Sequence, residues 1–144
     1  MSLDFLDEAR AGGDPGLLCA AVPMARFLGI VAELDGDDVI CRMPFTKRLI
    51  GNPAVPALHG GGVGTLLETA AMAQVLWTAE HQALPKTITI TVDYLRPALP
   101  KDTLAKSRII RLGRRVATVQ AEAWQGDKLV AVAKLQMLIE RAAT

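Results

Sequence analysis

The amino-acid sequence predicts an α+β protein in which a curved antiparallel sheet of about six strands wraps around one long central helix. Three observations carry this prediction. The run from His59 to Trp77, HGGGVGTLLETAAMAQVLW, is apolar enough for a buried helix. Thr87 to Leu95 alternates strictly between polar and apolar residues, as a strand does. Three further segments flank tight turns at Gly113 and Gly126, as in antiparallel hairpins.

Length and composition restrict the class of protein. The chain has 144 residues, which suits one domain, and we expect residues 1–26 to form an N-terminal helical and loop segment and residues 27–144 a single domain. A hydrophobic fraction of 51% and a formal charge of +1 do not suit a disordered chain or a nucleic-acid-binding protein. We therefore expect no nucleic-acid or membrane partner.

Cysteine and histidine usage argues against a metal site. Cys19 and Cys41 lie far apart in the sequence without a CxxC spacing, and the only histidines are His59 and His81. This pattern favours reduced thiols in a cytoplasmic protein, with no metal and no bound cofactor.

The residues before the central run predict four elements. Asp4 to Arg10 fits a short helix, and Phe27 to Leu34 and Val39 to Met43 fit two strands of a hairpin around Asp35 to Asp38. Pro44 to Leu58 holds three prolines and has no period, so we expect a loop.

The central run reads as a helix that is apolar on every side and therefore buried. Glu68, Gln74 and the initial glycines argue for burial in protein and against a membrane span. Unpaired N–H groups at such a helix start attract negative charge, and Gly60 to Gly62 allow close approach of a ligand.

The remaining segments predict four antiparallel strands. In Thr87 to Leu95, we place Thr87 on the face of the other threonines and Ile88, Ile90, Val92 and Tyr94 on the opposite face. Thr103 to Leu112 and Arg115 to Trp124 form a hairpin, whose small residues Ala117, Ala121 and Ala123 let a helix lie close. Leu129 to Ile139 is the last strand.

Several short motifs occur in a fixed order along these elements. They are HGG at 59–61, an acid nine positions after the histidine at Glu68, YLRPA at 94–98, LGRR at 112–115 and GDKLVAVA at 126–133. In this order they resemble the PaaI-type (phenylacetate-degradation-type) acyl-CoA thioesterases, which have the hotdog fold. The resemblance runs from about Phe27 to Ile139 and implies hydrolysis of an acyl-CoA thioester with a small or aryl acyl group.

Helix geometry separates the histidine from the acid. Nine residues of ideal helix correspond to about 180° of rotation and roughly 13 Å of rise, so His59 and Glu68 of one chain should not meet. If they share a site, a second copy of the chain must complete it. We therefore expect a homodimer, which we also expect to pair into a homotetramer.

Thioester hydrolysis needs a nucleophile and donors that face the developing oxyanion. The Gly60 N–H suits the donor role, and Glu68 suits either a general base or a direct nucleophile; the sequence leaves both routes open. The resemblance implies that His59 orients the thioester carbonyl, that Thr87 positions water, and that Asn52 matches a family asparagine. The segment between Asn52 and His59 is about one residue longer than in that family.

The candidate substrate-binding residues are Gly61, Leu67, Met72, Arg96, Arg114 and Arg115. The arginines suit coenzyme A phosphates, and the apolar side chains suit an acyl group.

Each assignment has a structural alternative. Glu68 would also fit a structural ion pair, His59 a helix cap, Thr87 the β-propensity of threonine, and the arginines a solvated hairpin. Two other functions stay open: a hotdog dehydratase or hydratase, because LETAAMAQ is similar to the EAMAQ helix of acyl-carrier-protein dehydratases, and a non-catalytic acyl-CoA-binding module.

Overall fold

The computed structural model describes residues 3–79, 81 and 83–140. Its elements in chain order are α1 (Asp4–Gly12), α2 (Gly16–Ala20), α3 (Pro23–Leu28), β1 (Val31–Asp35), β2 (Asp38–Met43), a 3-10 turn η1 (Lys47–Leu49), β3 (Ile50–Asn52), β4 (Ala57–Leu58), α4 (Gly60–Thr78), β5 (Lys86–Tyr94), β6 (Thr103–Leu112), β7 (Val116–Gln125) and β8 (Lys128–Leu138).

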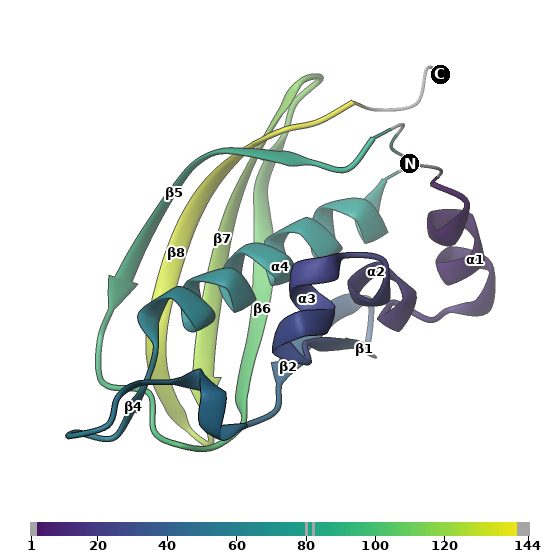
Figure 1. Cartoon of the computed structure of the whole chain (residues 1–144). Helices are drawn as coiled ribbons and strands as arrows, with labels where there is room; N and C mark the ends of the chain where they lie inside the picture. Colours follow the sequence, from purple (N-terminus) through teal and green to yellow (C-terminus); the bar gives the residue numbers. More distant parts are fainter. Residues whose placement is uncertain (1–2, 80, 82, 141–144) are drawn as a thin grey trace.

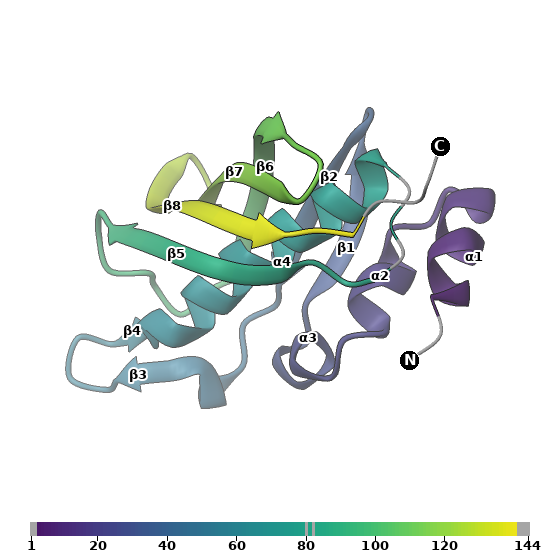
Figure 2. The ribbon, with the colours of Figure 1, turned by 90° about the horizontal axis from the view of Figure 1, so that it is seen from above.

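The main sheet has six strands in the order β1-β2-β6-β7-β8-β5, and every neighbouring pair is antiparallel. Figure 1 shows this sheet curving around α4, with the short N-terminal helices beside β1. Viewed from above, α4 lies across the concave face of the sheet (Figure 2). The predicted sheet around one long central helix is confirmed.

Small residues let α4 approach the sheet closely. Ala117, Ala121 and Ala123 of β7 are buried, as the sequence predicted. The Ser107 hydroxyl of β6 donates to the carbonyl of Ala70 in α4 at 3.1 Å. A bond this direct requires the helix to lie against the strands without large side chains between them.

One face of α4 is uncovered in the single chain. Leu66 and Ala70 are fully buried, whereas Gly61 and Glu68 are exposed. The predicted burial is confirmed from Thr69 to Leu76, where every residue is buried, and it is wrong in the single chain for the N-terminal half of the helix. The apolar side chains that appeared to surround the helix pack mainly against the sheet, while the glycines and Glu68 lie along the open side.

The first predicted strand is partly helical. Phe27 and Leu28 belong to α3, so a strand from Phe27 to Leu34 is wrong at its beginning. Pro23 at the helix start favours helical φ, and Gly29 ends the helix with φ 72 in the left-handed region. Only after that turn does the chain extend into β1.

The predicted loop from Pro44 to Leu58 contains a small second sheet. Strands β3 and β4 pair antiparallel, and the turn between them carries the two prolines that obscured the pattern. This hairpin delivers the chain to the start of α4.

Both cysteines lie in the core as free thiols. Cys19 comes from α2 and Cys41 from β2, so residues distant in sequence meet in the fold. The hydrogen bond with the Cys19 thiol, together with burial, raises the pKa of Cys41. This thiol is therefore poorly reactive in the folded protein.

Candidate active site

His59 caps the start of α4 with its side chain and its backbone. Its Nδ1 accepts a hydrogen bond from the Gly61 N–H at 2.8 Å, and its carbonyl accepts from the N–H groups of Gly62 at 3.0 Å and Val63 at 3.3 Å. A helix start leaves four N–H groups without intrahelical partners. Here these are the N–H groups of residues 59–62, and the Val63 bond is the first intrahelical one. Those of His59, Gly61 and Gly62 have acceptors, and within the described residues the Gly60 N–H has no hydrogen bond.

The cap fixes the tautomer of His59. Because a backbone N–H can only donate, Nδ1 must be the unprotonated nitrogen, and the proton of the neutral ring sits on Nε2. The side chain is exposed, so Nε2–H is a donor available to a ligand.

The end of η1 and strand β3 hold the backbone of His59. The His59 N–H donates to the Leu49 carbonyl at 2.7 Å. Gly51 lies so close that a Cβ on it would come within 2.5 Å of the His59 Cα. Only glycine fits at this position.

A cavity of about 400 Å³ opens beside the helix start. Gly60, Tyr94 and Arg96 line it together with Leu58, Val63, Leu95, Pro97, Ala98 and Val130. The structure thus brings His59, Gly60, Gly61 and Arg96 to one end of the molecule. Most of the wall is apolar, and Arg96 adds an exposed positive charge.

Asn52 stands at the end of β3 near this site. Its Oδ1 accepts from the Ala54 N–H at 3.1 Å, which stabilises the turn between β3 and β4. The side chain is exposed.

Glu68 lies further along α4 on the open face. Eight residues of continuous helix separate it from Gly60, about 12 Å along the axis. Met72 is 9% exposed on the same helix, and Leu67 is fully buried against the sheet. A single chain therefore does not bring Glu68 to His59.

A β-bulge changes which face Thr87 occupies. The register between β5 and β8 shifts between Thr87 and Thr89, so Thr87 pairs with Met137 and Ile90 with Leu135. Met137 and Leu135 are both buried, which places Thr87 on the helix-facing side with Ile90. The predicted grouping of Thr87 with Thr89 is wrong, and Ile88 is the extra residue of the bulge.

Thr87, Arg114 and Arg115 lie at the other end of the sheet from Gly60. Thr87 is seven residues from Tyr94, about 23 Å along β5. Arg114 and Arg115 are exposed in the β6–β7 turn, where the Arg115 carbonyl accepts from the Ile139 N–H at 2.8 Å. The predicted residues thus form two groups within one chain.

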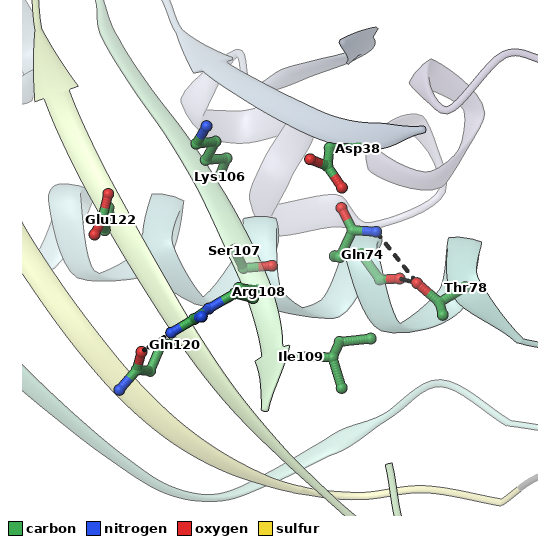
Figure 3. Close-up of a pocket in the computed structure, with 9 residues that line it drawn as sticks. All are labelled: Asp38, Gln74, Thr78, Lys106, Ser107, Arg108, Ile109, Gln120 and Glu122. Carbon is green, nitrogen blue, oxygen red and sulfur yellow. Dashed lines mark hydrogen bonds between the residues drawn. The ribbon is translucent and has the colours of Figure 1, made fainter. Parts of the chain in front are cut away.

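A second cavity, of about 410 Å³, contains none of the predicted site residues. It forms where β2 ends its pairing with β6, and its lining includes Asp38, Gln74 and Arg108. The Gln74 side chain accepts from the Val39 N–H at 2.8 Å. It also donates to the Thr78 hydroxyl at 3.2 Å (Figure 3). The polar contacts of Gln74 serve the packing of α4 against β2.

No group of three or more His, Cys, Asp or Glu side chains in the described part of the chain could hold a metal ion. Nor does any described helix have the length and apolar character needed to cross a membrane.

Comparisons with known proteins define the class. A profile of the acyl-CoA thioesterase N-terminal domain matches residues 52–138, more than half of the chain. The chain is 28% identical over 123 residues to the medium/long-chain acyl-CoA thioesterase YigI of Salmonella typhimurium, covering 75% of this chain and 79% of that protein. The Escherichia coli K12 protein of the same name is 27% identical over the same shares of both chains.

Solved structures share the fold. A Chromobacterium violaceum protein is 31% identical with a TM-score of 0.79 over 98% of this chain and 100% of its own. A phenylacetic acid degradation-related protein of Ralstonia eutropha is 28% identical with a TM-score of 0.76 over 93% and 98%. The architecture is the hotdog fold of thioesterases. The chain belongs to the acyl-CoA thioesterase family, and its class of activity is thioester hydrolysis.

The sequence analysis assigned no role to two residues of the site. Gly51 precedes the predicted Asn52, but an isolated glycine in a loop carries no sign of its close contact with His59. Tyr94 was part of the YLRPA motif without an assigned role, although its side chain lies against Gly60. The motif was the available signal for Tyr94.

Proposed function

We propose that the Gly60 N–H forms the oxyanion hole of an acyl-CoA hydrolase. The observation that carries this proposal is the hydrogen bonding of the helix start, where Gly61, Gly62 and Val63 are occupied and Gly60 remains open. The positive end of α4 adds to the stabilisation of a negative oxygen placed there. The exposed Nε2–H of His59 is a second donor that orients the thioester carbonyl.

Glu68 from a second copy of the chain supplies the nucleophile or its activation. In one route Glu68 takes a proton from water, which attacks the carbonyl carbon, and the C–S bond breaks to release coenzyme A as a thiolate that is then protonated. In the other route the Glu68 carboxylate attacks, the thiolate leaves, and water hydrolyses the resulting mixed anhydride. In both routes we assign the positioning of water to Thr87 of the second copy and to Asn52, which stands near His59 in the first. Neither route requires a metal or a bound cofactor, so activity should survive dialysis against EDTA.

The uncovered surfaces of one chain favour this dimer. Strand β5 is an edge strand with exposed apolar residues, Ile88 at 55% and Ile90 at 36%, and an unpaired edge of this kind invites pairing with another strand. Two β5 strands paired about an axis near Ile90 would bring Thr87 of each chain toward the helix start of the other. The open face of α4 with Glu68 would be covered in the same contact, and Arg114 and Arg115 would supply charge for phosphates. A homotetramer would pair two such dimers.

The test of the shared site is complementation between two inactive variants. Glu68→Gln and His59→Asn are each expected to lower kcat by about 100-fold or more; asparagine keeps a capping side chain at the start of α4. Subunits of the two variants are mixed, allowed to exchange, and assayed for coenzyme A release. Hybrid dimers with shared sites contain one intact site, so the mixture should recover about a quarter of wild-type activity.

Lack of recovery after verified exchange would contradict the shared site, since sites within one chain would stay defective in every hybrid. Light scattering of the wild type gives the second check, because a monomer at micromolar concentration would exclude the dimer. Release of coenzyme A by the wild type excludes the binding-module alternative. Hydration of an enoyl thioester without release would instead favour the dehydratase alternative.

The acyl group is the finer part of the proposal. The motifs imply a small or aryl group, whereas the apolar wall of the cavity beside Gly60, and the name of the YigI relatives, favour a medium or long chain. A panel of acetyl-, phenylacetyl-, octanoyl- and palmitoyl-CoA separates the two. We expect the highest kcat/KM for the acyl group that fills the apolar cavity. The order of kcat/KM across the panel decides between a small or aryl group and a medium or long chain.

A further inference from the structure

Tyr94 contacts the start of α4 from the end of β5. Its hydroxyl donates a hydrogen bond to the Gly60 carbonyl at 2.7 Å. Its ring lies against the bare faces of two glycines: a Cβ on Gly60 would be 3.2 Å from the Tyr94 Cζ, and one on Gly64 would be 3.3 Å from the hydroxyl oxygen. The glycines leave the space that this tyrosine occupies.

The Gly60 carbonyl and the Gly61 N–H belong to the same planar peptide group. One end of this group accepts from Tyr94 at 2.7 Å, and the other end donates to His59 Nδ1 at 2.8 Å. The plane is therefore held at both ends. In addition, a donor on the carbonyl polarises the peptide and strengthens the bond that its N–H makes.

We propose that Tyr94 is a positioning residue that acts through this peptide on His59. The chain of bonds runs from the Tyr94 hydroxyl through the Gly60–Gly61 peptide to Nδ1, and it keeps the His59 proton on Nε2, where it faces the substrate. The same contact fixes the first turn of α4 and with it the direction of the Gly60 N–H. The proposal rests on the thioesterase mechanism above only for its effect on rate.

If the Tyr94 hydroxyl had a purely structural role, its removal would lower stability and leave the state of His59 unchanged. Tyr94 is 54% exposed, so removing its oxygen buries no unpaired group and should leave stability almost unchanged. The effect of the hydroxyl should therefore appear in catalysis and in the state of His59.

The test is Tyr94→Phe, which keeps the ring and removes only the hydroxyl. Loss of one hydrogen bond of ordinary strength should lower kcat about threefold to tenfold, with KM changed by less than about twofold. Thr118→Val is the matched control, because it also removes one hydroxyl that donates one hydrogen bond, here to the Gln136 side chain at 2.8 Å on β7, away from Gly60; it should leave both constants unchanged.

Nitrogen NMR of 15N-histidine-labelled protein supplies a readout independent of activity. The chain has two histidines, so the spectrum of His59→Asn assigns both. In the wild type His59 should show an unprotonated Nδ1 and a protonated Nε2, and Tyr94→Phe should shift it toward a mixture of tautomers. Wild-type kcat in Tyr94→Phe, or a tautomer that does not respond, would overturn the proposal. If the wild type releases no coenzyme A, the proposed function fails, while the NMR signals still test the bond chain.

Discussion

The two ends of α4 differ in whether their terminal backbone groups have hydrogen-bond partners. At the C-terminal end, the guanidinium of Arg10 in α1 donates to the carbonyls of Leu76 and Ala79. Nearby, His81 Nε2 donates to the Val75 carbonyl at 2.9 Å, and this histidine is buried rather than solvated. At the N-terminal end, by contrast, the Gly60 N–H stays open beside a cavity.

The C-terminal end of α4 therefore contributes to stability, and its N-terminal end is available for chemistry. Carbonyls at a helix C-terminus favour a positive charge, which Arg10 provides, and that end is closed by the chain itself. Glycines at the other end remove the side chains that would cover the donors. Substitutions at the open end should therefore change the rate, and those at the closed end should change the free energy of unfolding.

Among the substitutions that compare the two ends of α4, the largest expected effect is that of Gly51→Ala beside the open end. The new Cβ would lie 2.5 Å from the His59 Cα, a backbone atom that cannot rotate away, so β3 and His59 must separate. A displacement of about 1 Å at a catalytic centre costs about 100-fold in kcat/KM. Acyl-CoA hydrolysis gives the change in kcat/KM, and thermal unfolding of the same variant gives the change in stability.

Gly12→Ala is the control for this substitution. A Cβ on Gly12 meets no atom within 4 Å, so activity should equal that of the wild type. If Gly51→Ala retains wild-type kcat/KM, the placement of His59 by β3 is wrong.

Local patterns were sufficient to predict the long elements. The apolar run gave α4 to within about a residue at each end, and alternation located β5, β6, β7 and β8. The Gly113 and Gly126 turns followed from composition, because few residues suit such tight connections.

Helix boundaries, a bulge and one long-range contact decided what periodicity could not predict. Phe27 has strong β-propensity, but Pro23 and Gly29 place it in a helix. Thr87 changed face because one bulge reverses the alternation. The bond from Tyr94 to Gly60 joins residues 34 positions apart, and no periodicity encodes such a contact.

A smaller effect is expected from Arg10→Met at the closed end. The substitution keeps an apolar stem and removes two charge-assisted hydrogen bonds to the end of α4. We expect the free energy of unfolding to fall by about 1.5–3 kcal/mol, measured by urea denaturation, with kcat unchanged. Arg26→Met is the matched control, since Arg26 donates only to the exposed Ala20 carbonyl at 2.7 Å and its loss should cost less. An equal loss in the two variants would show that Arg10 has no special role in closing the helix.

The smallest expected effect concerns the thiols beneath the N-terminal helices. Cys41→Ala removes one buried sulfur beside Cys19 and leaves a gap about the size of a methyl group, which should cost about 1 kcal/mol of unfolding free energy. Because Cys19 is 1% exposed and Cys41 0%, neither thiol should react with a thiol reagent until the protein unfolds. The rate of labelling should therefore rise with urea in step with unfolding. Rapid labelling of native wild type would contradict this prediction. It would mean that α2 opens from the sheet more easily than its packing implies.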